Sequence, residues 1–186
     1  TMRPEESLDL SENYRRTDEQ QAAISREHAR RTLLAGFTTV RDVGSYAAWA
    51  DRAIREEINL GETPGPRMQV AGIYLTIPKA ELAVAGGADL LKVIASGAVF
   101  AYGGKPGEPE MTPEEIAAVA KVAHSHGLKL VAHAHGARSI REAILAGADT
   151  IEHASLIDAE TIELARQHQV ALSMDVYNGD YTDTEG

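Results

Sequence analysis

Two stretches of this sequence follow one plan: SHGLKLVAH at residues 125–133 and LAGADTIEH at residues 145–153. In each, a helical pattern stops at a glycine, a short apolar run typical of a strand follows, and a histidine closes the run. These histidines, His133 and His153, both stand six residues after the glycine. The sequence therefore repeats one helix–turn–strand unit and puts a chemically capable side chain at the end of each strand.

Two further stretches, LAGFTTVRD and AVAGGADLLK, extend the repeat. Six residues after Gly36 stands Asp42, and six residues after Gly86 stands Lys92. We expect the four counted positions to be equivalent, at the carboxyl ends of their strands. In a (β/α)8 barrel those ends form the rim of the active site. The repeat thus predicts Lys92 and the two histidines around one mouth.

Helical and strand patterns alternate along the whole chain. The predicted helix N-caps are Thr17, Ser45, Thr112, Ser139 and Asp158. The predicted strands are residues 37–43, 67–73, 89–95, 128–134, 149–154 and 170–176. Alternation of this kind is typical of parallel strands joined by crossover helices. We therefore predict an α/β fold, a (β/α)8 barrel of the TIM type, formed as one domain over residues 1–186.

The composition of the chain limits the kinds of partner that it can bind. Lys and Arg number 18, Asp and Glu number 28, and the net charge is −10, which disfavours nucleic acid and anionic membranes as partners. The chain has no cysteine, so a disulfide scaffold and a thiolate metal site are excluded. No apolar run reaches the ~18 residues of a membrane span. The sequence does not decide the compartment, which is cytoplasmic or, if a signal peptide has been removed, periplasmic. We also expect a homo-oligomer.

The predicted rim has a functional and a structural interpretation. Neutral imidazole is a common zinc ligand, so His133 and His153 are candidate metal ligands, or else satisfied core histidines. Lys92 either reacts with carbon dioxide to form a carbamate that bridges two metal ions, or pairs with a carboxylate such as Asp42. His135 lies two residues past His133 and faces the same side of an extended strand. It is a candidate for contacting substrate or polarising a carbonyl, or a rim histidine that meets solvent.

The stretch YGGKPGEP, residues 102–109, follows a predicted strand end. It is not a phosphate-binding loop, because Pro106 follows its lysine where a Ser or Thr is required. A loop rich in glycine and proline at this place favours a substrate-facing role. We therefore predict Tyr102 as a substrate-binding residue.

The stretches AGFTTVRDVG, GADLLKVIASGAV, VAHAHG and AGADTIEHASLID together resemble the amidohydrolase superfamily. The resemblance covers about residues 29–176, and it is greatest to the branch of Xaa-Pro and Xaa-Arg dipeptidase-like proteins, imidazolonepropionase-like proteins and ochratoxin-degrading amidases. It implies a barrel with two metal ions, usually zinc. It also implies that carbamylated Lys92 bridges the ions, that His133 and His153 bind the second one, and that His135 lies near the substrate.

The resemblance further implies hydrolysis of an amide by a metal-bridging hydroxide, with a dipeptide or an N-acyl amino acid as substrate. Two alternatives remain: a cyclic-amide hydrolase of the imidazolonepropionase type, against which Lys92 argues, and a non-catalytic, decayed barrel module.

Two elements of the family pattern do not occur in the sequence. These are the His-x-His of the first strand and the Asp of the eighth. The stretch before GADLLK is also short for a crossover. We interpret the predicted strands as strands 2–7 of eight, and expect further residues before Thr1, near residues 78–79 and after Gly186.

Overall fold

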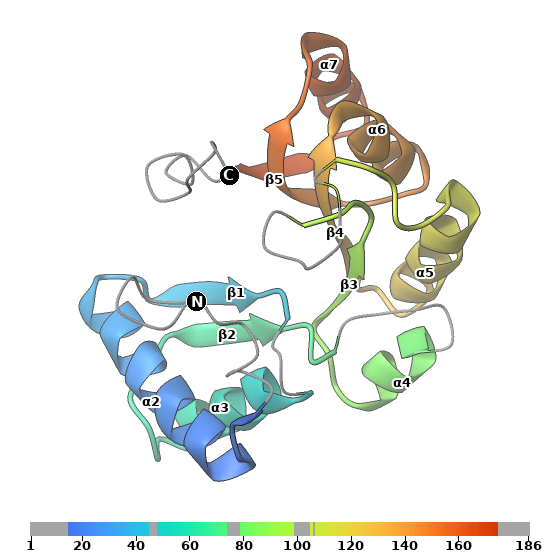
Figure 1. The fold of residues 1–186 in the computed structure, drawn as a ribbon. Helices are drawn as coiled ribbons and strands as arrows, with labels where there is room; N and C mark the ends of the chain where they lie inside the picture. The colour runs from blue at the N-terminus through green and yellow to red at the C-terminus, as the bar shows by residue number, and fades with distance from the viewer. Residues whose placement is uncertain (1–14, 45–47, 74–78, 99–104, 106, 175–186) are drawn as a thin grey trace. The chain divides into compact units, whose positions relative to one another are not determined.

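The computed structural model (Figure 1) describes residues 15–44, 48–73, 79–98, 105 and 107–174. Tyr102, the predicted substrate-binding residue, and Ser45, a predicted N-cap, lie outside the described residues. The chain forms two compact units, one of residues Thr1–Tyr74 and Ala83–Asp89, the other of Leu75–Leu82 and Leu90–Gly186. The division falls within the short helix α4 (Ala80–Ala85).

The first unit contains two helices and a small parallel sheet. Its elements are α2 (Asp18–Leu34), β1 (Thr39–Asp42), α3 (Ala50–Asn59) and β2 (Arg67–Val70). β1 and β2 run parallel with Thr39 opposite Arg67, and α3 contacts both α2 and β2. The predicted capping box at Thr17 is confirmed, because its hydroxyl accepts from the Gln20 N–H and its own N–H donates to the Gln20 side chain.

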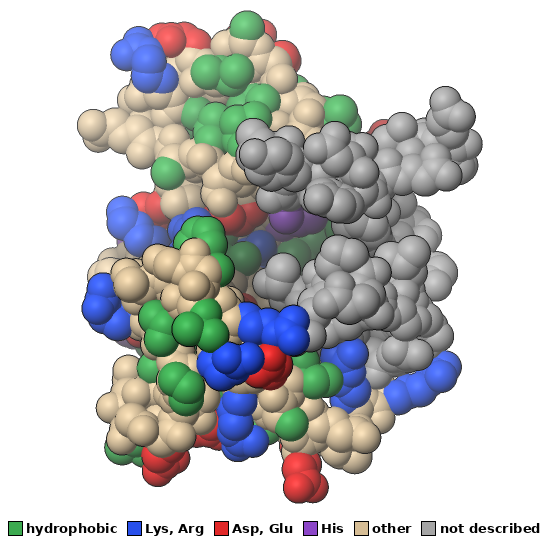
Figure 2. Space-filling model, turned by 90° about the vertical axis from the view of Figure 1, so that its left-hand side faces the viewer, with side chains coloured by type: hydrophobic (Ala, Val, Ile, Leu, Met, Phe, Trp, Pro, Cys, Tyr) green, Lys and Arg blue, Asp and Glu red, His purple; other side chains and the backbone are tan. Residues whose placement is uncertain are grey.

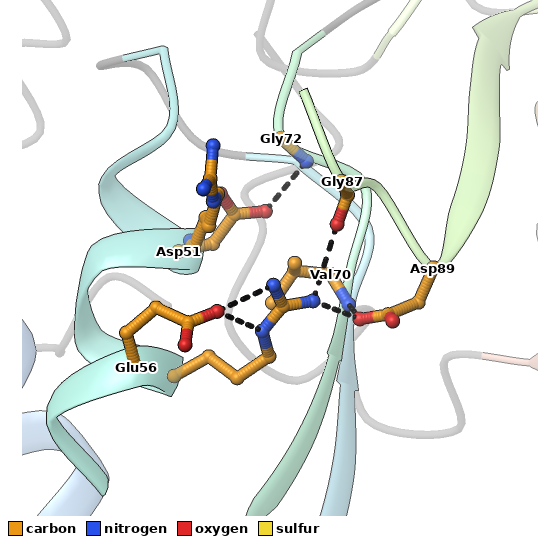
Figure 3. A network of polar contacts seen from close by, with 8 residues as sticks. Asp51, Glu56, Val70, Gly72, Gly87 and Asp89 are labelled. Atoms are coloured by element: carbon orange, nitrogen blue, oxygen red, sulfur yellow. Dashed lines mark hydrogen bonds and ion pairs between the residues drawn. The ribbon is translucent and has the colours of Figure 1, made fainter. Parts of the chain in front are cut away.

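Polar contacts tie α3 to the loop after β2 and to the segment before β3 (Figure 3). Asp51, almost fully buried, accepts the N–H of Gly72 at 2.8 Å. The Arg55 guanidinium contacts Glu56, the carboxylate of Asp89 and the carbonyl of Gly87. α3 begins at Ala50, after Trp49 in a left-handed conformation with φ 66°.

The second unit is a four-stranded parallel sheet with helices on one face (Figure 1). The strands lie in the order β3 (Leu90–Ile94), β4 (Lys129–Gly136), β5 (Thr150–Leu156) and β6 (Ala171–Met174). The helices are α5 (Pro113–Ser125), α6 (Ala137–Leu145) and α7 (Ala159–Gln167). α5 contacts β3 and β4, α6 contacts β4 and β5, and α7 packs on α6. Strands joined by such crossover helices confirm the predicted parallel α/β architecture.

The N-caps predicted for these three helices can each be compared with the structure. Thr112 forms the predicted capping box with Glu115, and Asp158 accepts the N–H of Thr161 at 2.8 Å, as predicted. The predicted cap at Ser139 is wrong. The N-cap of α6 is Gly136, three residues earlier, and the Ser139 hydroxyl is buried and donates to the carbonyl of Gly107 at 3.1 Å. In the part of the chain that the structure describes, no helix is both long and apolar enough to cross a membrane.

The core of the second unit lies between the sheet and its helices. Because side chains alternate along a strand, β4 sends one set toward the helices and the other to the opposite face. The helix-facing set is apolar and buried; on β3, β4 and β5 it comprises Leu91, Val93, Leu130, Ala132, Ala134 and Ile151. Burial of this set stabilises the fold at about 25 cal/mol per Å² of apolar surface. The opposite face is also buried, yet it carries polar side chains.

Candidate active site

The polar face of the second sheet holds most of the residues that the sequence singled out. Lys92 on β3 lies opposite Val131 on β4, and Val131 shares its face with His133 and His135. Lys92, His133 and His135 are 3%, 6% and 3% exposed, so three side chains able to bind protons or metals are buried on one face. In the view of Figure 2, histidine shows as one small purple area. Lysine is rarely fully buried unless it is paired.

The register of the sheet corrects the predicted equivalence of Lys92 and His133. The glycine that adopts the left-handed conformation before β3 is Gly87, with φ 82°, and not Gly86. A Cβ on Gly86 would lie 2.0 Å from the Trp49 ring, so close packing explains that glycine. Lys92 therefore stands five residues after the turn and lies opposite Val131, two residues below the level of His133.

His153 reaches the polar face by a different route. In the β4–β5 ladder its partner is Ala134, whereas Glu152 is the partner of His133. A regular strand would therefore turn His153 away from His133. His153 and Ala154 instead have φ angles of 73° and 51°, a left-handed conformation that residues other than glycine adopt at a cost. The departure from regular strand geometry brings the His153 ring within 4.6 Å of the His133 ring, centroid to centroid.

The three imidazoles form one cluster. The centroid of the His135 ring lies 4.7 Å from that of His133 and 5.0 Å from that of His153, with the His135 and His153 rings stacked. The sequence prediction that these histidines gather at the strand ends is therefore confirmed. The same prediction placed Asp42 at an equivalent position; its carboxylate accepts the N–H of Gly44 at 3.0 Å, in the first unit.

His133 is held as a neutral ring. Burial, together with the charges of His153, His135 and Lys92, lowers the pKa of His133 to about 3, while a hydrogen bond with the backbone of Gly97 opposes them. Its Nε2 atom is buried and has no hydrogen-bond partner among the described residues. The bond to Gly97 must therefore involve Nδ1. This arrangement leaves an unprotonated Nε2 with its lone pair available.

That state of His133 fits a metal ligand. Metal-bound histidines are neutral and commonly donate the second ring N–H to a carbonyl, which fixes the tautomer. A buried nitrogen without a partner costs free energy unless a ligand or an ion binds it. Among the described residues, however, no three His, Cys, Asp or Glu side chains are arranged as a complete ligand set. The unpartnered Nε2 atom of His133 is the stronger observation in favour of a metal site, because the predicted ligand set also includes Lys92, which is not one of those four residue types.

Residues 107–110 lie across the ends of β3 and β4, and we call this backbone segment the strap. The N–H of Gly97 donates to the carbonyl of Glu108, and the N–H of Glu110 donates to the carbonyl of Ala95. Gly136 directly follows the histidines, and a Cβ there would lie 2.4 Å from the Gly107 carbonyl oxygen. The strap belongs to the loop that the sequence marked as substrate-facing, although Tyr102 itself is outside the described residues.

The sequence reasoning did not find three polar residues of this site. Glu152, 7% exposed, lies opposite His133 and accepts a hydrogen bond from the Thr150 hydroxyl at 3.2 Å. Ser96 and Ser155 both contact His135. The alternation of TIE could have identified Glu152, because it shares a face with the residue two positions earlier. No local signal marks the serines, because their role depends on how three strands meet.

Comparison with known proteins supports one family. A model of the amidohydrolase family matches residues 3–185. Ochratoxinase from Aspergillus niger is 32% identical over 103 residues, which is 55% of this chain and 22% of that protein. The match therefore spans less than a quarter of that curated relative.

Solved structures extend the likeness to most of the chain. A Xaa-Pro dipeptidase with methionine bound in its active site is 29% identical, with a TM-score of 0.77 over 83% of this chain and 46% of that one. The structure of A. niger ochratoxinase gives a TM-score of 0.82 at 21% identity, over 90% of this chain and 48% of that one. The predicted fold class, α/β of the (β/α)8 type, is confirmed. With the family model matching nearly its full length, the chain belongs to the amidohydrolase family.

Proposed function

We propose that the protein is a metal-dependent hydrolase of amide bonds, acting on a dipeptide or an N-acyl amino acid. The observation that carries the proposal is His133. Its ring is neutral, its Nε2 atom is buried without a partner, and it lies within 5 Å of two other imidazoles. A purely structural histidine in such a place would have its second nitrogen satisfied.

The proposal assigns roles to four residues. His133 and His153 would hold one metal ion through their imidazole nitrogens, and Lys92, once carbamylated, would bridge two ions through its carboxylate oxygens. Two zinc ions, when bound, supply Lewis-acid polarisation of the carbonyl and a nucleophile at neutral pH. His135 would contact the amide and orient it. The buried polar face excludes bulk water, which strengthens each of these electrostatic contacts.

The relatives support the class of substrate. Ochratoxinase and Xaa-Pro dipeptidase, by their names, act on ochratoxin and on dipeptides that end in proline, and both classes of compound contain an amide. The burial of Lys92 on the face of His133 favours a site with a bridging lysine over one of the imidazolonepropionase type. The strap over the strand ends would contact the acyl or leaving group of such a substrate.

The test measures metal and turnover together. Protein purified without chelator should contain about two equivalents of zinc by elemental analysis, and should release the amine from N-acyl amino acids or dipeptides. With ¹³C-labelled bicarbonate, a carbamate signal should appear in the wild-type protein and disappear in Lys92→Gln. Lys129→Gln, which changes an exposed lysine of the same sheet, should keep both the signal and the metal.

Two results would contradict the proposal. Absence of metal after incubation with zinc and bicarbonate would favour a non-catalytic module of the family. Turnover of Lys92→Gln at the wild-type rate would remove the bridging role and favour a single-metal, cyclic-amide hydrolase.

A further inference from the structure

His135 is held by a serine from each neighbouring strand. Its backbone N–H donates to the Ser96 hydroxyl at 2.9 Å, and its Nδ1 atom lies 2.9 Å from the Ser155 hydroxyl. Ser96 stands two residues after the end of β3 and is fully buried, whereas Ser155 lies in β5, two residues after His153. Both the backbone and the ring of His135 are therefore fixed from outside its own strand.

The need for this support follows from the backbone. The pairing of β4 with β5 is in register up to Ala134 and shifts before Gly136. Such an irregularity disrupts the ladder and re-aims the side chain at that position. The His135 N–H lies on the β3 side of β4, where the carbonyl of His133 accepts the N–H of Ala95. Because β3 ends at Ile94, the Ser96 hydroxyl accepts the His135 N–H in place of a strand carbonyl, and no buried donor is left unsatisfied.

We propose that Ser155 is a positioning residue that donates its hydroxyl proton to Nδ1 of His135 and holds that ring in the tautomer protonated at Nε2. A hydroxyl can both donate and accept, so the contact alone permits either direction. Donation by Ser155 gives the histidine cluster one N–H donor beside the lone pair of His133. The opposite direction would add a second lone pair and leave no proton for a carbonyl oxygen.

The consequence deepens the proposed function and rests on it. An Nε2–H donor near the bound amide polarises its carbonyl oxygen, and such a donor helps most when its orientation is fixed before the reaction. His133 and His135 are two residues apart on one strand, yet they then present opposite hydrogen-bonding groups. Gly97 sets the tautomer of the first and Ser155 that of the second.

The direct test is the tautomer itself. In ¹⁵N-histidine-labelled wild-type protein, the two-bond nitrogen–proton correlations of His135, assigned with His135→Gln, should show Nε2 protonated and Nδ1 unprotonated. Ser155→Ala should shift the two nitrogens toward a mixture, whereas Ser155→Thr, which keeps the hydroxyl, should restore the wild-type pattern. Ser125→Ala, which removes an exposed hydroxyl bonded to a helix carbonyl, is the matched control. A wild-type ring protonated at Nδ1, or an unchanged pattern in Ser155→Ala, would overturn the inference.

Kinetics separates this inference from the proposed function. Ser155→Ala should lower kcat for an amide substrate about 10-fold, the lower end of the range for removing an orienting partner, with KM and metal content unchanged. A change in KM alone, or loss of metal, would contradict the positioning role. If the wild-type protein shows the expected tautomer but hydrolyses no amide, the proposed function fails while the assignment of the Ser155 proton stands.

Discussion

The corners that lead into β3 and into β5 are near copies of each other, whereas the ends of those two strands are not alike. At the first corner the N–H of Asp89 donates to the carbonyl of Val70, and its carboxylate accepts the Val70 N–H. At the second, Asp149 makes the same pair of bonds with Leu130. Each aspartate thus forms hydrogen bonds with both the N–H and the carbonyl of one residue on the preceding strand.

The carboxyl ends of the strands diverge from this pattern. β3 continues into buried Ser96 and the strap, while β5 turns through the left-handed His153 and Ala154. In barrels of this kind, residues at the amino ends of strands support stability and those at the carboxyl ends support activity. The repeat thus specifies the corners that lead into the strands, whereas the residues of the proposed site lie where the strand ends depart from the repeat. Substitutions at the two ends should therefore have separate effects.

The largest effect is expected from His153→Ala. Loss of a ligand should empty the proposed metal site and reduce amide hydrolysis more than about 100-fold, because even outer partners of ligands are worth 10- to 100-fold. The midpoint of urea unfolding should hardly change, since His153 is partly exposed and its ring lies outside the apolar core. Zinc content and turnover are the measurements, with His168→Ala at the end of α7 as control. Unchanged zinc in His153→Ala would mean that the strand ends are structural too.

Substitution of the corner aspartates, Asp89 and Asp149, should lower the stability of the fold and leave the metal content unchanged. Asp149→Ala leaves the N–H of fully buried Leu130 without its acceptor, which costs about 1–3 kcal/mol of the free energy of unfolding. Asp89→Ala should cost a similar amount through Val70. Urea denaturation measures both, and Asp149→Asn, which keeps an oxygen acceptor, should lose less. Metal content should stay at the wild-type level. A loss of metal without a loss of stability would contradict the division between the two ends.

Much of the scaffold could be predicted because its signals are local. The caps at Thr17, Thr112 and Asp158 each need only a residue three positions along the chain. Ser139 has the same local pattern, yet its hydroxyl is used by Gly107, which is distant in the sequence. Local pattern was insufficient there because a tertiary contact competed for the side chain.

Lys92 and the three clustered histidines of the candidate site could be predicted from the sequence, but their levels along the strands could not. Counting from Gly86 placed Lys92 level with the histidines, because a Gly-Gly pair does not show which glycine takes the left-handed turn. The parallel sheet is also staggered by one residue at each step: Lys92 stands five residues after its turn, Val131 four and Thr150 three, and the three lie side by side. Such a stagger follows from the tilt of strands in a barrel.

Alanine substitutions at the turn glycines before the two strands should have smaller effects on stability. Gly87 and Gly147 have φ angles of 82° and 101°, so alanine at either should cost about 1–2 kcal/mol for the left-handed conformation. Gly147→Ala should cost more, because its Cβ would lie 3.3 Å from the Ala120 methyl, whereas the nearest atom to Gly87 is 3.9 Å away. Gly61→Ala, with φ 75° and open space, isolates the backbone cost. Thermal or urea unfolding that ranked Gly61→Ala as the most damaging would contradict this order.

The smallest effect concerns acid. Burial would raise the pKa of Asp149, but hydrogen bonds from Lys129, His124 and the Leu130 N–H outweigh burial and lower it. A carboxyl with a lowered pKa in the folded state stabilises that state above its unfolded value of about 3.9, and this contribution is lost as pH falls through the folded pKa. The difference in unfolding free energy between wild type and Asp149→Asn should therefore shrink as pH falls below about 4. Urea titrations at each pH measure it. A difference that grew below about pH 4 would mean that the hydrogen bonds to Asp149 do not stabilise the ionised carboxylate, and the two corners would then be alike in their backbone bonds alone.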